Sequence, residues 1–328
     1  MITRRRNLAA LGLLAAPLAA PWIARAQPRW TPERPVAFLG PFAAGGAFDV
    51  TQRAIARAVE PLLGQPIAVL NRTGAAGTIM LAELARARPD GHTIGLLSVN
   101  TNAVAPQLQD LAFDPVTDFT PLITYGAFLT FVAVARQAPF ATFAELLAFA
   151  RREPGRLSIG VSGIGANSHL NMARLAAEEN LDVTFVPFSG GAPASTALLG
   201  GHLLCAVVAG EVLPAVRDGS LRLLAILNAD KSEEFLAVPT LPELGYSWSS
   251  RPWLGFGGPR GLPDAVTARW VEALEAATRQ DEVLAVMRNL AIVPMRRGPA
   301  ETRALMVESL AEHERIARAI RIGRFAPR

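Results

Sequence analysis

The stretch Val36 to Val50 limits the fold most tightly, because it joins an apolar run to a helical pattern through a loop of small residues. Val36 to Leu39 are short, apolar and bounded by Pro35 and Gly40, which predicts a buried strand. Apolar residues then recur at helical spacing from Val50 to Leu62. A strand that enters a helix in this way directs free backbone N–H groups toward whatever lies in front. This geometry suits an anion, although tight packing alone also explains such a turn.

Loops of this kind occur three times in the chain, and they supply most of the candidate ligand-binding residues. The first loop contributes Phe42, Ala43, Ala44, Gly45, Gly46 and Asp49. The second contributes Ser162, Gly163, Gly165, Ala166, Asn167 and His169. The third repeats the first in a form one residue shorter and contributes Phe188, Ser189, Gly190, Gly191, Ala192 and Pro193. None is a Walker phosphate loop or a dinucleotide fingerprint, since the lysine and the glycine spacing of those motifs are absent.

Polar residues near these loops have a functional and a structural interpretation. Asp49 could meet a ligand ammonium or hydroxyl, or it could cap the first turn of its helix. Asn100 follows a predicted strand and could line a cleft or form an Asx turn. His169 could act as an acid or base, or pack at a helix start. Ser162 lies in a sequence that misses the last glycine of the nucleophile elbow. We therefore expect no enzyme, and neither a cofactor nor a metal.

The first 26 residues predict an export signal. Arg4 to Arg6 form a positive region, Leu8 to Ala20 an apolar one, and Ala24 to Ala26 an A-x-A cleavage site before Gln27. The apolar run is shorter than the roughly 18 residues that a membrane span needs. We expect cleavage after Ala26 and a periplasmic protein, by either the general or the twin-arginine route.

The charge balance excludes an electrostatic argument for nucleic acid. The chain has 32 Lys+Arg and 28 Asp+Glu, but four arginines leave with the signal, so that the mature protein is formally neutral. No basic run is interleaved with aromatic residues. Cys205 is the only cysteine, which excludes a disulfide within one chain, and its apolar neighbours predict a buried thiol.

Predicted strands and helices alternate along the mature chain. Strands are expected at 36–39, 67–70, 93–99, 129–135, 157–161, 183–186, 203–208, 221–227 and 253–257. Helices are expected at 50–62, 78–88, 143–150, 167–179, from 193, at 212–217 and over most of the tail from 263. Such alternation predicts an α/β fold with parallel sheets and right-handed crossovers. Ligands of such sheets bind beyond the carboxyl ends of the strands, where the three loops lie.

Several longer segments together resemble one protein family. They are RPVAFLGPFAAGGAFDV, GQPIAVLNRTGAAGTI, ARPDGHTIGLLS, FDPVTDFTPL, PGRLSIGVSGIGANSHL, VPFSGGAPA and VPTLPEL. With them the chain resembles the extracytoplasmic solute-binding proteins of tripartite tricarboxylate transporters, often called the Bug family. The resemblance implies a type II periplasmic-binding-protein fold, in which two α/β lobes are joined by two crossover strands and hold a small carboxylate between them. Lobe 1 would comprise residues 29–127 and 254–328, and lobe 2 residues 128–253.

The resemblance also implies a function. We expect a monomer that captures a di- or tricarboxylate, an amino acid or an aromatic acid and delivers it to the membrane permease subunits of such a transporter. An exported sensor that presents its ligand to a receptor kinase is the alternative. Phe188 and Ser189 replace the family's usual Tyr-Lys, Ala166 replaces a Ser or Thr, and the segment Val207 to Val212 is one residue shorter than is typical.

Overall fold

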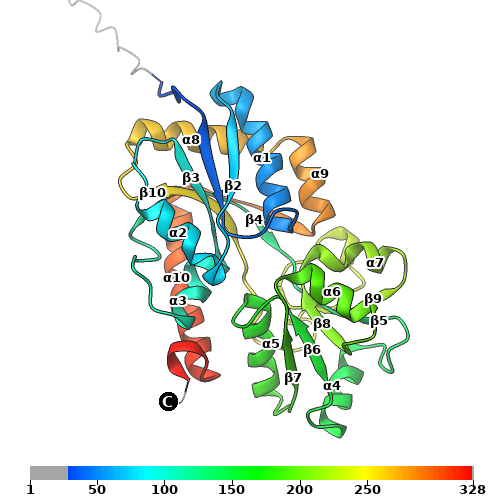
Figure 1. Cartoon of the computed structure of the whole chain (residues 1–328). Helices are drawn as coiled ribbons and strands as arrows, with labels where there is room; N and C mark the ends of the chain where they lie inside the picture. The colour runs from blue at the N-terminus through cyan, green and yellow to red at the C-terminus, as the bar shows by residue number, and fades with distance from the viewer. Residues whose placement is uncertain (1–28, 327–328) are drawn as a thin grey trace, which may run out of the picture.

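The computed structural model describes residues 29–326 and contains two β-sheets, each flanked by helices (Figure 1). Six strands form the first sheet in the order β11-β4-β10-β3-β1-β2. Their bounds are β1 Val36–Gly40, β2 Ile67–Asn71, β3 Thr93–Ser98, β4 Phe119–Phe128, β10 Leu254–Pro259 and β11 Ile292–Arg297. We call this sheet and the helices around it the first lobe.

The helices of the first lobe cover an aromatic core. They are α1 Ala47–Leu63, α2 Thr78–Ala85, α3 Ala105–Leu108, α8 Asp264–Ala277, α9 Asp281–Asn289 and α10 Pro299–Ala319. Phe38 of β1 packs between Phe256 of β10 and Trp270 of α8, with ring centroids 5.1 and 5.5 Å away. Gly64 ends α1, because its left-handed backbone lets its N–H bond to the carbonyl of Glu60.

The second lobe is built on a five-stranded sheet in the order β7-β6-β8-β5-β9. Its strands are β5 Phe131–Ala135, β6 Ser158–Val161, β7 Thr184–Pro187, β8 Cys205–Val208 and β9 Leu221–Ile226. Its helices are α4 Phe143–Arg152, α5 Asn167–Glu178, α6 Gly191–Leu199 and α7 Leu213–Arg217. Thr142 caps α4 by accepting a hydrogen bond from the N–H of Glu145. The α/β fold class with two lobes is confirmed.

Both sheets are mixed, so the prediction of parallel sheets holds for only part of each. β1 pairs in parallel with β2 and β3, and β6 with β7 and β8. β10 is antiparallel to β3 and β4, and β5 is antiparallel to β8 and β9. The chain explains the difference, because β5 and β10 each enter a sheet from the other lobe. They start at the edge where the parallel strands end and therefore run against them.

The chain passes between the lobes twice, and the two passages are tied together. β4 leads into β5 through residues 129–130, and β9 leads back to β10 through residues 227–253. Asn228 on the second passage accepts a hydrogen bond from the N–H of Thr130 (2.8 Å) and donates one to the carbonyl of Phe128 (3.1 Å). The lobe boundaries expected at 127/128 and 253/254 fall beside these passages, and we keep them as a proposal.

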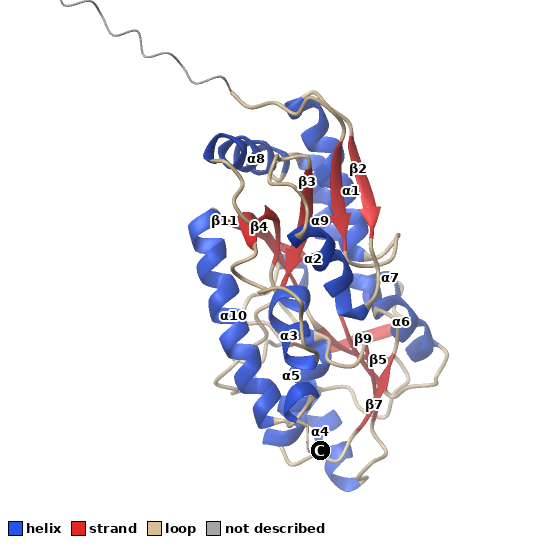
Figure 2. Ribbon diagram, turned by 60° about the vertical axis from the view of Figure 1, so that its left-hand side comes forward, coloured by secondary structure: helices blue, strands red, loops and turns tan. Residues whose placement is uncertain are grey.

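Two strands of the first sheet were not predicted. β4 contains Pro121, and a proline argues against a strand in the interior of a sheet. In the structure Pro121 lies opposite Gly257 of β10, next to a shift in the register between the two strands. β11 lies at the edge of the sheet in the tail that was expected to be mostly helical. The next helix, α10, begins beside β11, runs down past α3 and reaches α5 of the second lobe, as Figure 2 shows.

Candidate ligand-binding cleft

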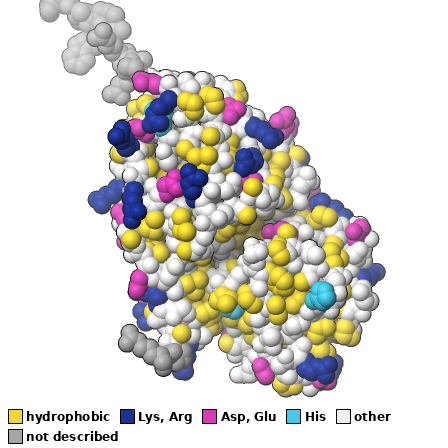
Figure 3. Space-filling model, in the orientation of Figure 1, with side chains coloured by type: hydrophobic (Ala, Val, Ile, Leu, Met, Phe, Trp, Pro, Cys, Tyr) yellow, Lys and Arg dark blue, Asp and Glu magenta, His cyan; other side chains and the backbone are white. Residues whose placement is uncertain are grey.

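The parallel strands of both sheets end at the space between the lobes. β1 and β3 bring the first loop and Asn100 to the edge of the first lobe, and β6, β7 and β8 bring the second and third loops and the turn Gly210–Val212 to the edge of the second. Figure 3 shows the surface hollowed here, with mostly hydrophobic and uncharged atoms around the hollow. The structure thus brings the predicted loops of both lobes to one cleft.

The first loop presents the N-terminus of α1 with its donors free. Among residues 29–326, no protein group accepts a hydrogen bond from the N–H groups of Gly46, Ala47 or Phe48. Ala43 and Ala44 are exposed, and Phe42 packs against Phe48 with ring centroids 4.6 Å apart. The N-terminus of a long helix with three free donors is a good site for a carboxylate.

Only one of the two glycines in this loop needs a glycine backbone. Gly45 has a φ of +83°, whereas Gly46 is extended with a φ of −74°. A Cβ placed on Gly46 would meet nothing closer than the carbonyl oxygen of Ala43 at 3.5 Å. The role of Gly46 is therefore that its lack of a side chain leaves the N–H groups at the N-terminus of α1 accessible.

Asp49 shapes the first loop. Its buried carboxylate accepts hydrogen bonds from Gly45 N–H (2.9 Å), Asn71 Nδ2 (2.9 Å) and Arg53 Nε (2.9 Å). Burial alone would raise the pKa of this carboxyl, but the bonds from Arg53, Gly45 and Asn71 outweigh it and lower the pKa. The arrangement supports the structural interpretation of Asp49, because its oxygens already hold protein donors.

Three successive N–H groups of the second loop donate to protein acceptors. Asn100 of the first lobe accepts a hydrogen bond from the N–H of Asn167 (3.1 Å), the first residue of α5. The N–H of Gly165 donates to His169 Nδ1 (2.9 Å), and that of Ala166 to the carbonyl of Gly163 (3.2 Å). This loop therefore holds the lobes together and offers fewer groups to a ligand than the first loop does.

His169 and Ser162 do not form a catalytic pair. Burial lowers the pKa of His169, which packs edge-on against Phe185 with ring centroids 4.7 Å apart. Its Nδ1 accepts from Gly165, and within the described chain no hydrogen bond joins it to Ser162, which is half-buried. Gly163 has a φ of +145° and Gly165 a φ of +71°, so that both positions favour glycine.

The third loop places the N-terminus of α6 on the second lobe's side of the cleft. Gly190 precedes the helix with a φ of +150°, and the N–H groups of Gly191 and Ala192 have no protein acceptor among the described residues. Pro193 has no N–H to leave unpaired. Phe188 is half-buried and packs into the core of its lobe, whereas Ser189 is exposed.

Sequence reasoning missed Glu211, which lies in the turn after β8. A Cβ placed on Gly191 would lie 2.6 to 2.8 Å from the atoms of the Glu211 carboxyl, so that this carboxyl rests on the first residue of α6. Its Oε2 is buried and has no hydrogen-bond partner. Burial raises the pKa of Glu211 above its ordinary value. The sequence signal that could have identified Glu211 is that it is the single acidic residue in the apolar run Val207 to Leu213.

A buried polar network joins the lobes beside the cleft. His313 Nε2 of α10 lies 3.1 Å from Asn167 Oδ1, and Asn167 Nδ2 donates to Ser250 Oγ (2.9 Å) on the returning passage. Asn171 Nδ2 also donates to Ser250 Oγ, at 3.0 Å. Burial lowers the pKa of His313, whose other ring nitrogen, Nδ1, lies 2.8 Å from the carbonyl oxygen of Ser309. Asn167 thus serves the connection of the lobes.

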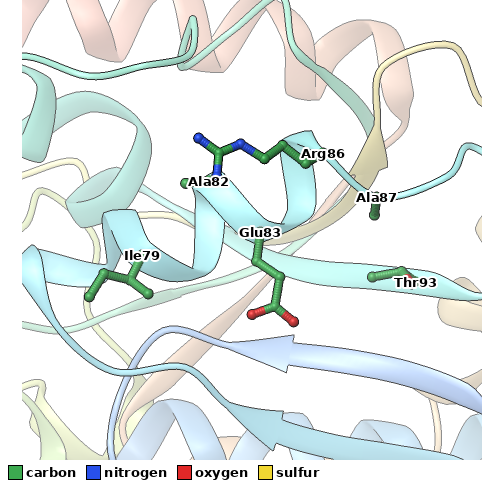
Figure 4. A pocket seen from close by; sticks show the side chains of 6 residues that line it. All are labelled: Ile79, Ala82, Glu83, Arg86, Ala87 and Thr93. Atoms are coloured by element: carbon green, nitrogen blue, oxygen red, sulfur yellow. The ribbon is translucent and has the colours of Figure 1, made fainter.

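A separate hollow lies on α2, away from the three loops. As Figure 4 shows, it is lined by side chains of α2, of the turn after it and of the start of β3, namely Ile79, Ala82, Glu83, Arg86, Ala87 and Thr93. Glu83 already forms a salt bridge with Arg72 (2.8 Å). Among residues 29–326, no group of three His, Cys, Asp or Glu side chains is arranged to hold a metal.

Comparison with known proteins identifies the family. The family described as "TctC: Tripartite tricarboxylate transporter family receptor" matches residues 51–322. The chain belongs to this receptor family. Protein BugT of Bordetella pertussis is 30% identical over 317 residues, which cover 93% of this chain and 94% of that protein.

Two solved structures of these receptors resemble the chain closely. MatC (Rpa3494) from Rhodopseudomonas palustris, solved with bound malate, has a TM-score of 0.79 and 30% identity, and the match covers 87% of this chain and 99% of that one. Rpa4515 of R. palustris, solved with adipate, has a TM-score of 0.81 and 27% identity, with 89% and 99% covered.

Membership settles the broad class of the protein. The family and the fold are those of periplasmic solute-binding receptors and not of enzymes. No helix of the described chain is long and apolar enough to span a bilayer. The expected signal peptide, residues 1–26, lies outside the described residues, so that its cleavage and export route stay predictions.

Proposed function

We propose that this receptor captures a small carboxylate in the cleft between its lobes and delivers it to the membrane permease of a tripartite tricarboxylate transporter. The observation that carries the proposal is the pair of helix N-termini, those of α1 and α6, whose backbone donors have no protein acceptor in the described chain. Each N-terminus presents the positive end of a helix dipole, which stabilises a negative charge.

The cleft residues of the proposal are those of the three loops, with different roles. Residues 42–46 and 188–193 supply open N–H groups and small side chains that allow close approach. Asn100, Asn167 and His169 orient the second loop. The neighbours solved with malate and with adipate support a carboxylate as the ligand class.

A thermal-shift screen of the mature protein tests the proposal. Mono-, di- and tricarboxylates and aromatic acids would be added one at a time. A ligand at 100 times its dissociation constant should add about 2.7 kcal/mol to the free energy of unfolding. Mass spectrometry should recover that ligand unchanged, because this is a binder without turnover. A protein that no carboxylate stabilises would overturn the proposal.

Gly46→Val tests the place of binding. A Cβ at this position would meet nothing closer than the Ala43 carbonyl oxygen at 3.5 Å, and a branched side chain would stand at the free N–H groups of α1. Gly298→Val is the matched control, since Gly298 precedes α10 with the same φ of −74° and a Cβ placed on it would have no atom within 4 Å. We expect Gly46→Val to weaken carboxylate binding at least tenfold and the control to leave it unchanged.

Delivery and oligomeric state have their own tests. Proteoliposomes that contain the cognate permease subunits should take up the ligand only when the receptor is added. Light scattering should give the mass of one chain. Uptake at the same rate without the receptor would contradict the delivery step while leaving ligand capture intact.

A further inference from the structure

Glu211 is the charged group of the cleft that has no ionic partner. Residues 41–48, 162–169 and 187–193 contain no Lys or Arg. Asp49 is paired with Arg53 at 2.9 Å, and His169 is kept neutral by burial, which lowers its pKa. Within residues 29–326, Glu211 forms no salt bridge. Glu211 is therefore the acidic side chain on the second lobe's side of the cleft with which a cationic group of a ligand can pair.

The surroundings of Glu211 leave its hydrogen bonding incomplete. The turn Gly210–Val212 follows the carboxyl end of β8, the same edge at which β6 and β7 end. The carboxyl rests on Gly191, and its Oε2 is shielded from solvent without a donor. An ionised carboxyl can accept about four hydrogen bonds, and one that is shielded and unpaired is unfavourable. A ligand that brings a donor to this oxygen would relieve that cost.

We propose that Glu211 binds an ammonium group of the ligand, so that the cleft selects a small amino-carboxylate over a plain dicarboxylate. This inference rests on the proposed capture of a carboxylate. The carboxylate of the ligand lies at the N-terminus of α1. Its ammonium donates to Glu211 Oε2, and the Glu211 carboxylate lies between that ammonium and the positive N-terminus of α6. An ammonium has three N–H donors and a charge opposite to that of the carboxyl.

The alternative ligand arrangement is less favourable at this position. A dicarboxylate that spans the cleft would bring its second carboxylate against Glu211. Two carboxylates in contact cannot both be ionised without a large penalty, so that a dicarboxylate would bind only with Glu211 protonated, whereas an ammonium stabilises the ionised carboxylate. The loops offer no Lys or Arg side chain to offset that repulsion. A zwitterion avoids the conflict.

Calorimetry with matched pairs of acids tests the inference. The pairs are glutamate and glutarate, aspartate and succinate, and 4-aminobutyrate and butyrate, which differ within each pair by the amine. The mature receptor should bind the amine-bearing member of at least one pair about tenfold more tightly than its partner. A tenfold difference in affinity is what the free energy of one charge-assisted hydrogen bond would produce. Glu211→Gln keeps the shape and removes the charge, and it should abolish that ratio.

Glu314→Gln is the control, because Glu314 is an exposed acid on α10 that pairs with Arg318. It should leave every ratio unchanged. Equal or tighter binding of the plain acids by the parent protein would overturn the role of Glu211 and leave carboxylate capture standing. A preference for the amine-bearing acids that persists in Glu211→Gln would also overturn the role of Glu211 and leave carboxylate capture standing. Failure of the parent protein to bind any carboxylate would overturn both proposals.

Discussion

Replacing Gly210 with Ala should force the two lobes apart. The Cα of Gly210, in the turn after β8, faces the backbone at the end of α9 in the other lobe. A Cβ there would lie 2.2 Å from the carbonyl oxygen of Leu290 and 2.5 Å from its carbonyl carbon. Both partners are backbone atoms, so that no rotamer change relieves the overlap. The two segments must separate by roughly 1 Å to restore ordinary contact.

The cost should match that of overpacking, about 1–3 kcal/mol. Because the lobes are joined only by two passages and their contacts, part of the strain can be released by rotation. We therefore expect Gly210→Ala to lower the free energy of unfolding in urea and to change the small-angle scattering profile of the ligand-free protein. Gly298→Ala is the control, since no atom lies within 4 Å of its Cβ, and it should stay within about 0.5 kcal/mol of the parent. If the two variants behave alike in both measurements, the reasoning about this contact is refuted.

Three further predictions concern the loop anchor, the pH dependence and the N-terminus. Asp49→Ala should lower the free energy of unfolding in urea by about 1.5–3 kcal/mol, because the charged hydrogen bonds to Gly45, Asn71 and Arg53 are lost. An unchanged urea midpoint would show that Asp49 does not hold the first loop in place. Burial lowers the pKa values of His169 and His313, so that on acidification the unfolded chain takes up protons before the folded one does. The free energy of unfolding should therefore fall as the pH drops below about 6.5, which urea midpoints at pH 7 and pH 5 measure. Replacing both histidines by Gln should reduce the difference between the two midpoints. Sequencing of the periplasmic protein should begin at Gln27, and an intact Met1 would contradict export.

The loops of the cleft could be predicted because their geometry is local. A short apolar strand, a glycine and a helical period lie within 15 residues around Gly45, and the same order recurs around Gly190. Small residues and positive φ angles at these positions follow from the chain itself. Family resemblance then placed the loops in two lobes.

The remaining features depend on contacts between distant segments. Glu211 belongs to no recognisable motif, and its Oε2 is shielded by packing in which its carboxyl rests on Gly191 of α6. Asn100 was placed near the cleft, but its bond to the first N–H of α5 requires the other lobe to be in position. The direction of β5 and β10 likewise follows from where the chain enters each sheet. The local periodicity of the sequence carries no information on the burial of Glu211, the bond of Asn100 or the direction of these two strands.

The bonds of Asn228 affect the thermodynamics of ligand capture. They tie the passages at Phe128 and Thr130 to each other. In the capture that we propose, the lobes would therefore close as preformed bodies and order no new backbone, so that the entropy loss of about 1–2 kcal/mol per residue that accompanies a folding loop would not arise. The heat capacity change on binding should accordingly be small, because it reflects only the apolar surface that the cleft itself removes from water.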